Sequence, residues 1–71
     1  MKKVIVLGAG MVGRAMAIDL AKNFKVTVAD VNPDNLKLLS ENGIVETVLA
    51  DLSLAEKIRE LVAGFDLVVG A

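Results

Sequence analysis

The sequence predicts an α/β fold in three layers, with a parallel four-stranded sheet and three helices in the order βαβαβαβ. Short β-branched runs alternate along the chain with longer stretches in which apolar residues recur at helical spacing. Strands that alternate with single helices imply a parallel sheet with right-handed crossovers. The composition agrees, because 55% of the residues are hydrophobic and strands buried on both faces need such an excess.

The first part of the chain contains two expected strands with a helix between them. Residues 3–7 form a mostly β-branched run that ends at Gly8, which suits a fully buried strand. Residues 11–22 are expected to form a helix, and residues 24–29 a second strand that Asp30 closes. The apolar face of this helix is predicted to consist of Val12, Ala15, Met16, Ile18 and Leu20.

The second helix is predicted to begin at Asn32 and Pro33. Asparagine can cap the free N–H groups of a helix start, and proline suits the first helical position. The expected core face of this helix consists of Leu36, Leu38 and Leu39. Asn42 and Gly43 end it, with the glycine in the left-handed conformation, and residues 44–49 form the third strand.

The third helix is predicted from a capping box. Ser53 and Glu56 have the S-x-x-E spacing, in which each side chain satisfies a free N–H group of the helix start. This helix extends to Ala63, Gly64 stops it, and residues 66–70 form the fourth strand. Its core face is expected to consist of Leu54, Ile58, Leu61 and Val62.

Three glycines between the first strand and the first helix indicate a phosphate-binding loop. Gly8, Gly10 and Gly13 have the spacing G-x-G-x-x-G. The first glycine permits a tight turn, the second lets a pyrophosphate approach the backbone, and the third lets the helix pack close to the strand. We expect the free N–H groups near Met11 and Val12 to face the phosphates. A tight strand–helix turn without a ligand is the alternative interpretation.

Asp30 is the predicted ribose-binding residue. It ends the second strand about 20 residues beyond the glycine motif, where a carboxylate can accept hydrogen bonds from the ribose hydroxyls. Such a carboxylate also repels a 2′-phosphate, and no arginine occurs in residues 31–33. The sequence therefore favours NAD over NADP, with Val31 beside the site. A solvated acid or a helix cap is the alternative for Asp30.

Two further segments are candidates for weaker contacts with the dinucleotide. In this architecture the strand order is 3-2-1-4, so the third and fourth strands are the edges of the sheet. Asp51 and Leu52 follow the third strand, where the adenine would lie, although a plain loop is equally consistent. Gly70 and Ala71 end the fourth strand beside the pyrophosphate, or simply terminate it.

The composition argues against several other classes of protein. The chain has no cysteine and no histidine, so we expect no disulfide, no thiolate metal site and a cytoplasmic location. The 8 basic residues are balanced by 9 acidic ones and aromatic residues are 3% of the chain, which argues against a nucleic-acid partner. No apolar run reaches the ~20 residues of a membrane-spanning helix.

The stretches GAGMVGRAMA, VADVNPDNL and FDLVVGA resemble the N-terminal half of the Rossmann NAD-binding domain of the saccharopine dehydrogenase family. The resemblance covers all 71 residues and is closest to members that oxidise lysine or related amino acids with NAD. It implies that Gly8, Gly10 and Gly13 hold the pyrophosphate and that Asp30 holds the ribose. The family's substrate-binding and proton-transferring residues have no counterpart, so we expect residues 1–71 to be a single truncated domain without catalysis of its own.

Two other functions stay open at this point, together with a prediction of assembly. A regulatory nucleotide-sensing domain of the potassium-transport type shares the glycine loop and the acid, and an engineered minimal scaffold would bind no ligand. Val68 and Val69 lie on the bare edge of the fourth strand. An unprotected edge invites pairing, so we expect a homodimer through this strand, or a swapped form.

Overall fold

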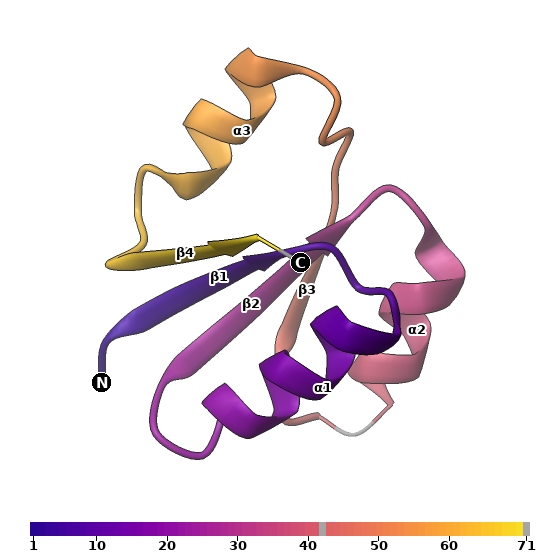
Figure 1. Cartoon of the computed structure of the whole chain (residues 1–71), viewed down its shortest axis with the longest axis vertical. Coiled ribbons are helices and arrows are strands. Elements are labelled where there is room, and N and C mark those ends of the chain that lie inside the picture. The colour runs from indigo at the N-terminus through magenta and orange to yellow at the C-terminus, as the bar shows by residue number, and fades with distance from the viewer. Residues whose placement is uncertain (42, 71) are drawn as a thin grey trace.

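In a computed structural model, which describes residues 1–41 and 43–70, the chain forms four strands and three helices (Figure 1). Their order along the chain confirms the predicted βαβαβαβ arrangement. The elements are β1 (Lys3–Leu7), α1 (Met11–Leu20), β2 (Lys25–Asp30), α2 (Pro33–Ser40), β3 (Glu46–Leu49), α3 (Ala55–Val62) and β4 (Leu67–Gly70).

All strand pairs are parallel, and the strands lie in the order β3-β2-β1-β4, as predicted. The connections from β1 to β2 and from β2 to β3 run in one direction across the sheet, and the connection from β3 to β4 runs back. Because such crossovers are right-handed, α1 and α2 lie on one face of the sheet and α3 on the other (Figure 1). The fold is therefore the three-layer, Rossmann-like arrangement that the sequence predicts.

The hydrophobic core lies mainly between the sheet and the helices α1 and α2. Alternate residues of the two central strands point into it and meet the buried side of both helices. Its members are Val4, Val6, Ala9, Ala17, Val26, Val28, Leu36, Leu39 and Val45. On the other face, Ile5, Thr27 and Ala29 are buried, yet no residue of α3 is buried.

The predicted apolar faces of the helices were partly wrong. Gly13 and Ala17 are the buried residues of α1, whereas Val12 is 67% exposed. Leu20 also packs against the core and Met16 is half-buried, whereas Ala15 and Ile18 of the predicted face are exposed. In α2, Leu36 and Leu39 are buried as predicted, but Leu38 is 52% exposed because it lies about 200° around the helix from Leu36.

The predicted N-terminal cap was correct for α2 and wrong for α3. The Asn32 side chain accepts a hydrogen bond from the Asp34 N–H at 2.9 Å, which confirms the predicted cap of α2. The capping box was wrong, because Leu54 is the N-cap of α3 and Ser53 donates its hydroxyl hydrogen to Asp51 instead. Gly43 has the predicted left-handed backbone, with φ of 65°, while Asn42 lies outside the described residues.

Candidate functional site

The carboxyl ends of the four strands form the edge of the sheet at which the predicted site residues gather. Leu7, at the end of β1, pairs with Ala29 of β2 and with Gly70 of β4. Asp30, at the end of β2, pairs with Leu49 of β3. The loops that follow β1, β2 and β3 therefore lie side by side along one edge, with the end of β4 beside β1. The predicted contact at Ala71 lies outside the described residues.

The glycine loop combines a turn that favours glycine with open space beside its backbone. Gly8 has φ of 115°, a conformation that favours glycine, and its N–H donates to the Ala29 carbonyl at 2.8 Å. Gly10, the N-cap of α1, has φ of −68°, which any residue can adopt. A Cβ added to Gly10 would meet no atom within 4 Å. The bare Cα of Gly10 thus leaves open space beside the backbone, which fits the close approach of a pyrophosphate.

The N-terminus of α1 is open. No side chain caps it among the residues that the structure describes, and its first two residues, Met11 and Val12, are 80% and 67% exposed. The first N–H groups of a helix have no partner within the helix and point toward its positive end, which attracts anions. Gly13 is buried against the sheet, as expected for the third glycine. This helix start fits the phosphate groups of a dinucleotide.

The carboxylate of Asp30 lies at the glycine loop and connects two segments of the edge. Its Oδ2 accepts a hydrogen bond from the N–H of Ala9 at 2.6 Å, and its Oδ1 accepts one from the N–H of Asn32 at 2.9 Å. Each carboxylate oxygen has two lone pairs, so both can still accept hydrogen bonds from hydroxyl groups. Asp30 therefore stands directly beside the loop that would hold the pyrophosphate, where a ribose would reach it.

These hydrogen bonds keep Asp30 charged. The Asn32 N–H contributes most to lowering the pKa of Asp30 below its usual range, and the Ala9 N–H lowers it further. Partial burial acts in the opposite direction and does not outweigh them. A carboxylate that stays ionised at neutral pH is the better acceptor for ribose hydroxyls and repels a phosphate.

The loop after β3 is organised by its own side chains. Asp51 accepts hydrogen bonds from the backbone N–H of Ser53 at 2.9 Å and from its hydroxyl at 2.6 Å, and the hydroxyl contributes most to lowering the pKa of Asp51. Leu52 is half-buried, while Val31, directly after β2, is 63% exposed. Asp51 therefore has a structural role in this loop, and Val31 offers the free apolar surface at this part of the edge.

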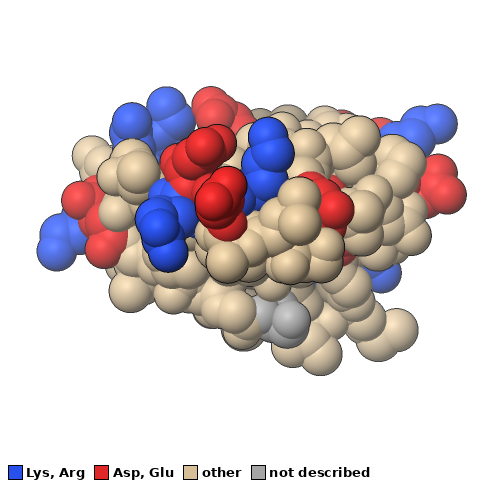
Figure 2. Space-filling view, turned by 90° about the horizontal axis from the view of Figure 1, so that it is seen from above, with Lys and Arg blue, Asp and Glu red and all other residues tan. Residues whose placement is uncertain are grey.

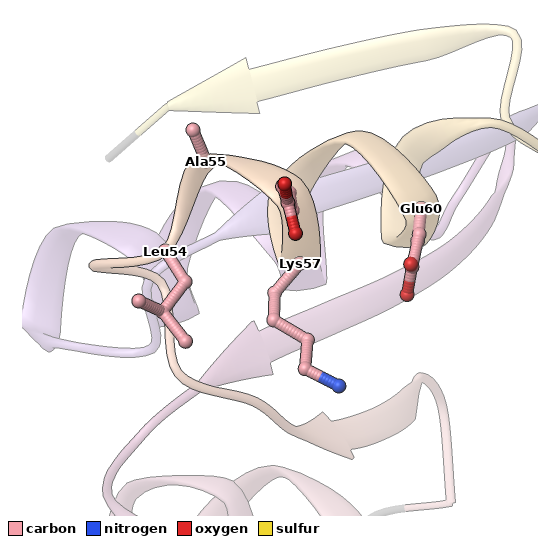
Figure 3. Close-up of a pocket in the computed structure, with 5 residues that line it drawn as sticks. Leu54, Ala55, Lys57 and Glu60 are labelled. Carbon is pink, nitrogen blue, oxygen red and sulfur yellow. The ribbon is translucent and has the colours of Figure 1, made fainter.

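A pocket of about 290 Å³ lies along α3, away from the glycine loop and Asp30. It is lined by Leu54, Ala55, Glu56, Lys57 and Glu60. Figure 3 shows the side chains of Leu54, Lys57 and Glu60 on the same side of this helix. Over the face that carries α3, basic and acidic side chains are interspersed and neither sign dominates (Figure 2).

Residues 1–41 and 43–70 contain neither a metal-binding cluster nor a membrane-spanning helix. They contain no group of three or more acidic, histidine or cysteine side chains that could hold a metal ion. No helix in the same part of the chain has the length and apolar character needed to cross a membrane.

Sequence reasoning did not identify Ala9 as a site residue. Ala9 is fully buried, and its N–H provides the contact between the glycine loop and Asp30. The sequence signal for this role was the small side chain of Ala9 between two glycines, because it lets the end of a neighbouring strand approach the amide. The pairing itself depends on the register of β1 and β2, which the sequence pattern does not specify.

Comparisons with known proteins agree with this fold. Residues 4–71 match the family described as the saccharopine dehydrogenase NADP binding domain. The chain is also similar to the crystal structure of a 3-hydroxyacyl-CoA dehydrogenase from Archaeoglobus fulgidus, with a TM-score of 0.75 and 26% sequence identity. This similarity covers 99% of the chain and 24% of the dehydrogenase, so the chain spans about a quarter of that protein's length. No curated protein matches the sequence. The matches confirm the family resemblance and a module for nicotinamide dinucleotides.

Proposed function

Because this chain belongs to the family of the saccharopine dehydrogenase NADP binding domain, we propose that it binds NAD through the glycine loop and Asp30. The pyrophosphate would lie over Gly10 at the start of α1, and the adenosine ribose would bind the carboxylate of Asp30. The observation that supports this most directly is the hydrogen bond of 2.6 Å between the Asp30 carboxylate and the Ala9 N–H. It holds the ribose-binding group and the phosphate-binding loop at adjacent positions.

The proposal specifies NAD although the family description names NADP. A 2′-phosphate would have to lie beside the Asp30 carboxylate, which both of its hydrogen bonds keep ionised. The 2′-phosphate and the Asp30 carboxylate would both be negatively charged, and like charges on adjacent groups repel each other. The adjoining residues 31–33 supply no cation to offset this repulsion.

The proposed role is cofactor binding within an oxidoreductase of amino acids, of the lysine or saccharopine type, without catalysis by these residues alone. Proton transfer to or from a substrate needs a positioned acid or base. The chain has no histidine, tyrosine or cysteine, and the carboxylates of Asp30 and Asp51 already accept hydrogen bonds from the backbone. Nicotinamide supplies the hydride chemistry when it is bound.

Titration of NAD⁺, NADP⁺ and ATP by calorimetry tests this proposal, with Asp30→Ala as the site variant. We expect NAD⁺ to bind best, and the variant to bind it about tenfold to a hundredfold more weakly, because charged hydrogen bonds to the ribose are lost. Asp19→Ala is the matched control, since this exposed carboxylate pairs with Lys22 on the surface of the molecule. Equal binding of all three nucleotides would favour a sensing domain, and no binding would favour a scaffold without a ligand.

We also propose that two copies of the chain associate through the outer edge of β4. This strand pairs only with β1 among the described residues, and it contains neither a charge nor a proline that would protect an edge. Its residues Leu67 and Val68 are 49% and 43% exposed.

Sedimentation analysis tests this association. We expect a dimer at high micromolar concentration and a monomer for Val68→Lys, because a lysine at an edge opposes strand pairing. Ile44→Lys is the control, since Ile44 is 54% exposed but lies before β3, away from this edge. A wild-type chain that stays monomeric would contradict the proposal.

A further inference from the structure

We infer that Asn32 and Pro33 determine specificity at the dinucleotide site, because they leave the backbone of residues 32–34, next to Asp30, without a free donor for a 2′-phosphate. This inference rests on the proposed binding of NAD at Asp30. It adds a second reason for the exclusion of NADP, which is independent of the charge of Asp30. It also assigns a ligand-related role to residues that otherwise serve only to start a helix.

The start of α2 is where a 2′-phosphate would otherwise find hydrogen-bond donors. α2 begins three residues after Asp30, at the same edge of the sheet as the glycine loop. A carboxylate at the position of Asp30 faces the ribose 2′-hydroxyl, so a phosphate on that hydroxyl would lie next to the helix start. Free N–H groups at a helix N-terminus readily bind such an anion.

Each of the first three backbone positions of this turn is closed to an anion. The Asn32 N–H donates to Asp30 Oδ1 at 2.9 Å. Pro33 has no N–H. The Asp34 N–H donates to Asn32 Oδ1 at 2.9 Å. In addition, Asp34 places an exposed carboxylate in the first turn of α2, where a second negative group would be repelled.

The two helices α1 and α2 lie on the same face of the sheet (Figure 1), but their N-termini differ in capping. Among the described residues, no side chain caps Gly10 at the start of α1, whereas the Asn32 side chain caps α2. A bound dinucleotide would place its pyrophosphate at the open helix start and its ribose at the closed one. The start of α1 would therefore accept the pyrophosphate, whereas the start of α2 would reject a 2′-phosphate.

The test compares the Kd values of NAD⁺ and NADP⁺ in a background that removes the charge of Asp30. Asp30→Asn retains one oxygen, which can still accept from the Asn32 N–H, but its NH2 group cannot accept from the Ala9 N–H. Both dinucleotides are therefore expected to bind more weakly, and the comparison uses the ratio of their Kd values. Asn32→Gly is then added to free the Asp34 N–H, since helices tolerate glycine at the N-cap almost as well as asparagine. Asn32→Ser is the matched control because serine still caps. Pro33→Ala is a second test variant that restores an N–H with a good helix former.

We expect Asp30→Asn to retain a preference for NAD⁺. Adding Asn32→Gly or Pro33→Ala should lower the ratio of the Kd of NADP⁺ to that of NAD⁺ by about a further tenfold, through one charge-assisted hydrogen bond. Asn32→Ser should leave the ratio unchanged. The inference is overturned if Asp30→Asn alone abolishes the preference, or if both added variants shift the two affinities equally. Failure of the wild-type chain to bind either dinucleotide overturns the proposed function and this inference with it.

Discussion

The carboxylate of Asp30 and the backbone N–H of Ala9 are 2.6 Å apart, although 21 residues separate them in the sequence. The contact joins the end of β2 to the loop that follows β1, at the carboxyl edge of the sheet. It fixes the position of the glycine loop and holds a charged group beside it. Three of the following predictions test this arrangement, and the fourth tests the core that supports it.

Gly10→Ala is expected to weaken dinucleotide binding without unfolding the chain. A Cβ at Gly10 meets no protein atom within 4 Å, and its φ of −68° suits alanine. The added methyl group would instead occupy the space of the pyrophosphate, so we expect affinity to fall about tenfold or more. Calorimetric titration measures the affinity, and circular dichroism measures the stability. Gly64→Ala is the control, because it also meets nothing within 4 Å but lies between α3 and β4.

Gly8→Ala is expected to destabilise the fold itself. Gly8 has φ of 115°, which side-chain-bearing residues rarely adopt, so the substitution should cost about 1 to 3 kcal/mol in the free energy of unfolding. Urea titration followed by circular dichroism measures this change. A Gly8→Ala protein as stable as Gly10→Ala would show that the turn does not need the glycine conformation.

The free energy of unfolding is expected to fall below about pH 4, close to the usual pKa of aspartate. Hydrogen bonds hold the pKa of Asp30 in the folded chain below its usual value, and the same is true of Asp51. Their stabilising contributions are therefore complete above the unfolded pKa and are lost as pH falls through the folded one. Thermal melts across the acid range should show a shallower decline for Asp30→Asn. An unchanged slope would contradict the role of Asp30, and Asp19→Asn is the surface control.

Leu39→Ala and Leu38→Ala form a matched pair that tests the packing of α2. Leu39 is 2% exposed in the core, so its truncation should cost about 2 to 5 kcal/mol, enough to unfold a chain of this size. Leu38 is 52% exposed and should tolerate the change with little loss. Chemical denaturation of both variants measures the difference. Similar losses at the two positions would contradict the orientation of the helix.

The order of the elements could be predicted because local signals agreed at almost every boundary. Glycine or proline marks most boundaries of the predicted elements, and the strands are rich in β-branched residues. The faces of the helices were harder to predict, as Val12 and Leu38 show. Periodicity identifies apolar positions, but in a chain with 55% hydrophobic residues it does not tell which of them face the sheet.

The segments that meet at the candidate site could be predicted from the sequence, but their hydrogen bonds could not. The glycine spacing and the position of Asp30 predicted which segments meet at the edge of the sheet. The partner of the Asp30 carboxylate depends on the path of the loop at Ala9, which only the folded backbone defines. Ser53 shows the same limit, because its hydroxyl could reach either the helix start or Asp51, and the loop geometry favours Asp51.

The absence of buried residues in α3 has a consequence for how the chain folds. β1, β2 and β3 can assemble with α1 and α2 from neighbouring segments, and these close most of the core. β4 must return to β1 across the whole chain, through a helix that adds little hydrophobic stabilisation, so it carries the largest loop-closure entropy. We therefore expect β4 to join last during folding, and the backbone amides of α3 and β4 to exchange their hydrogens with deuterium first under native conditions.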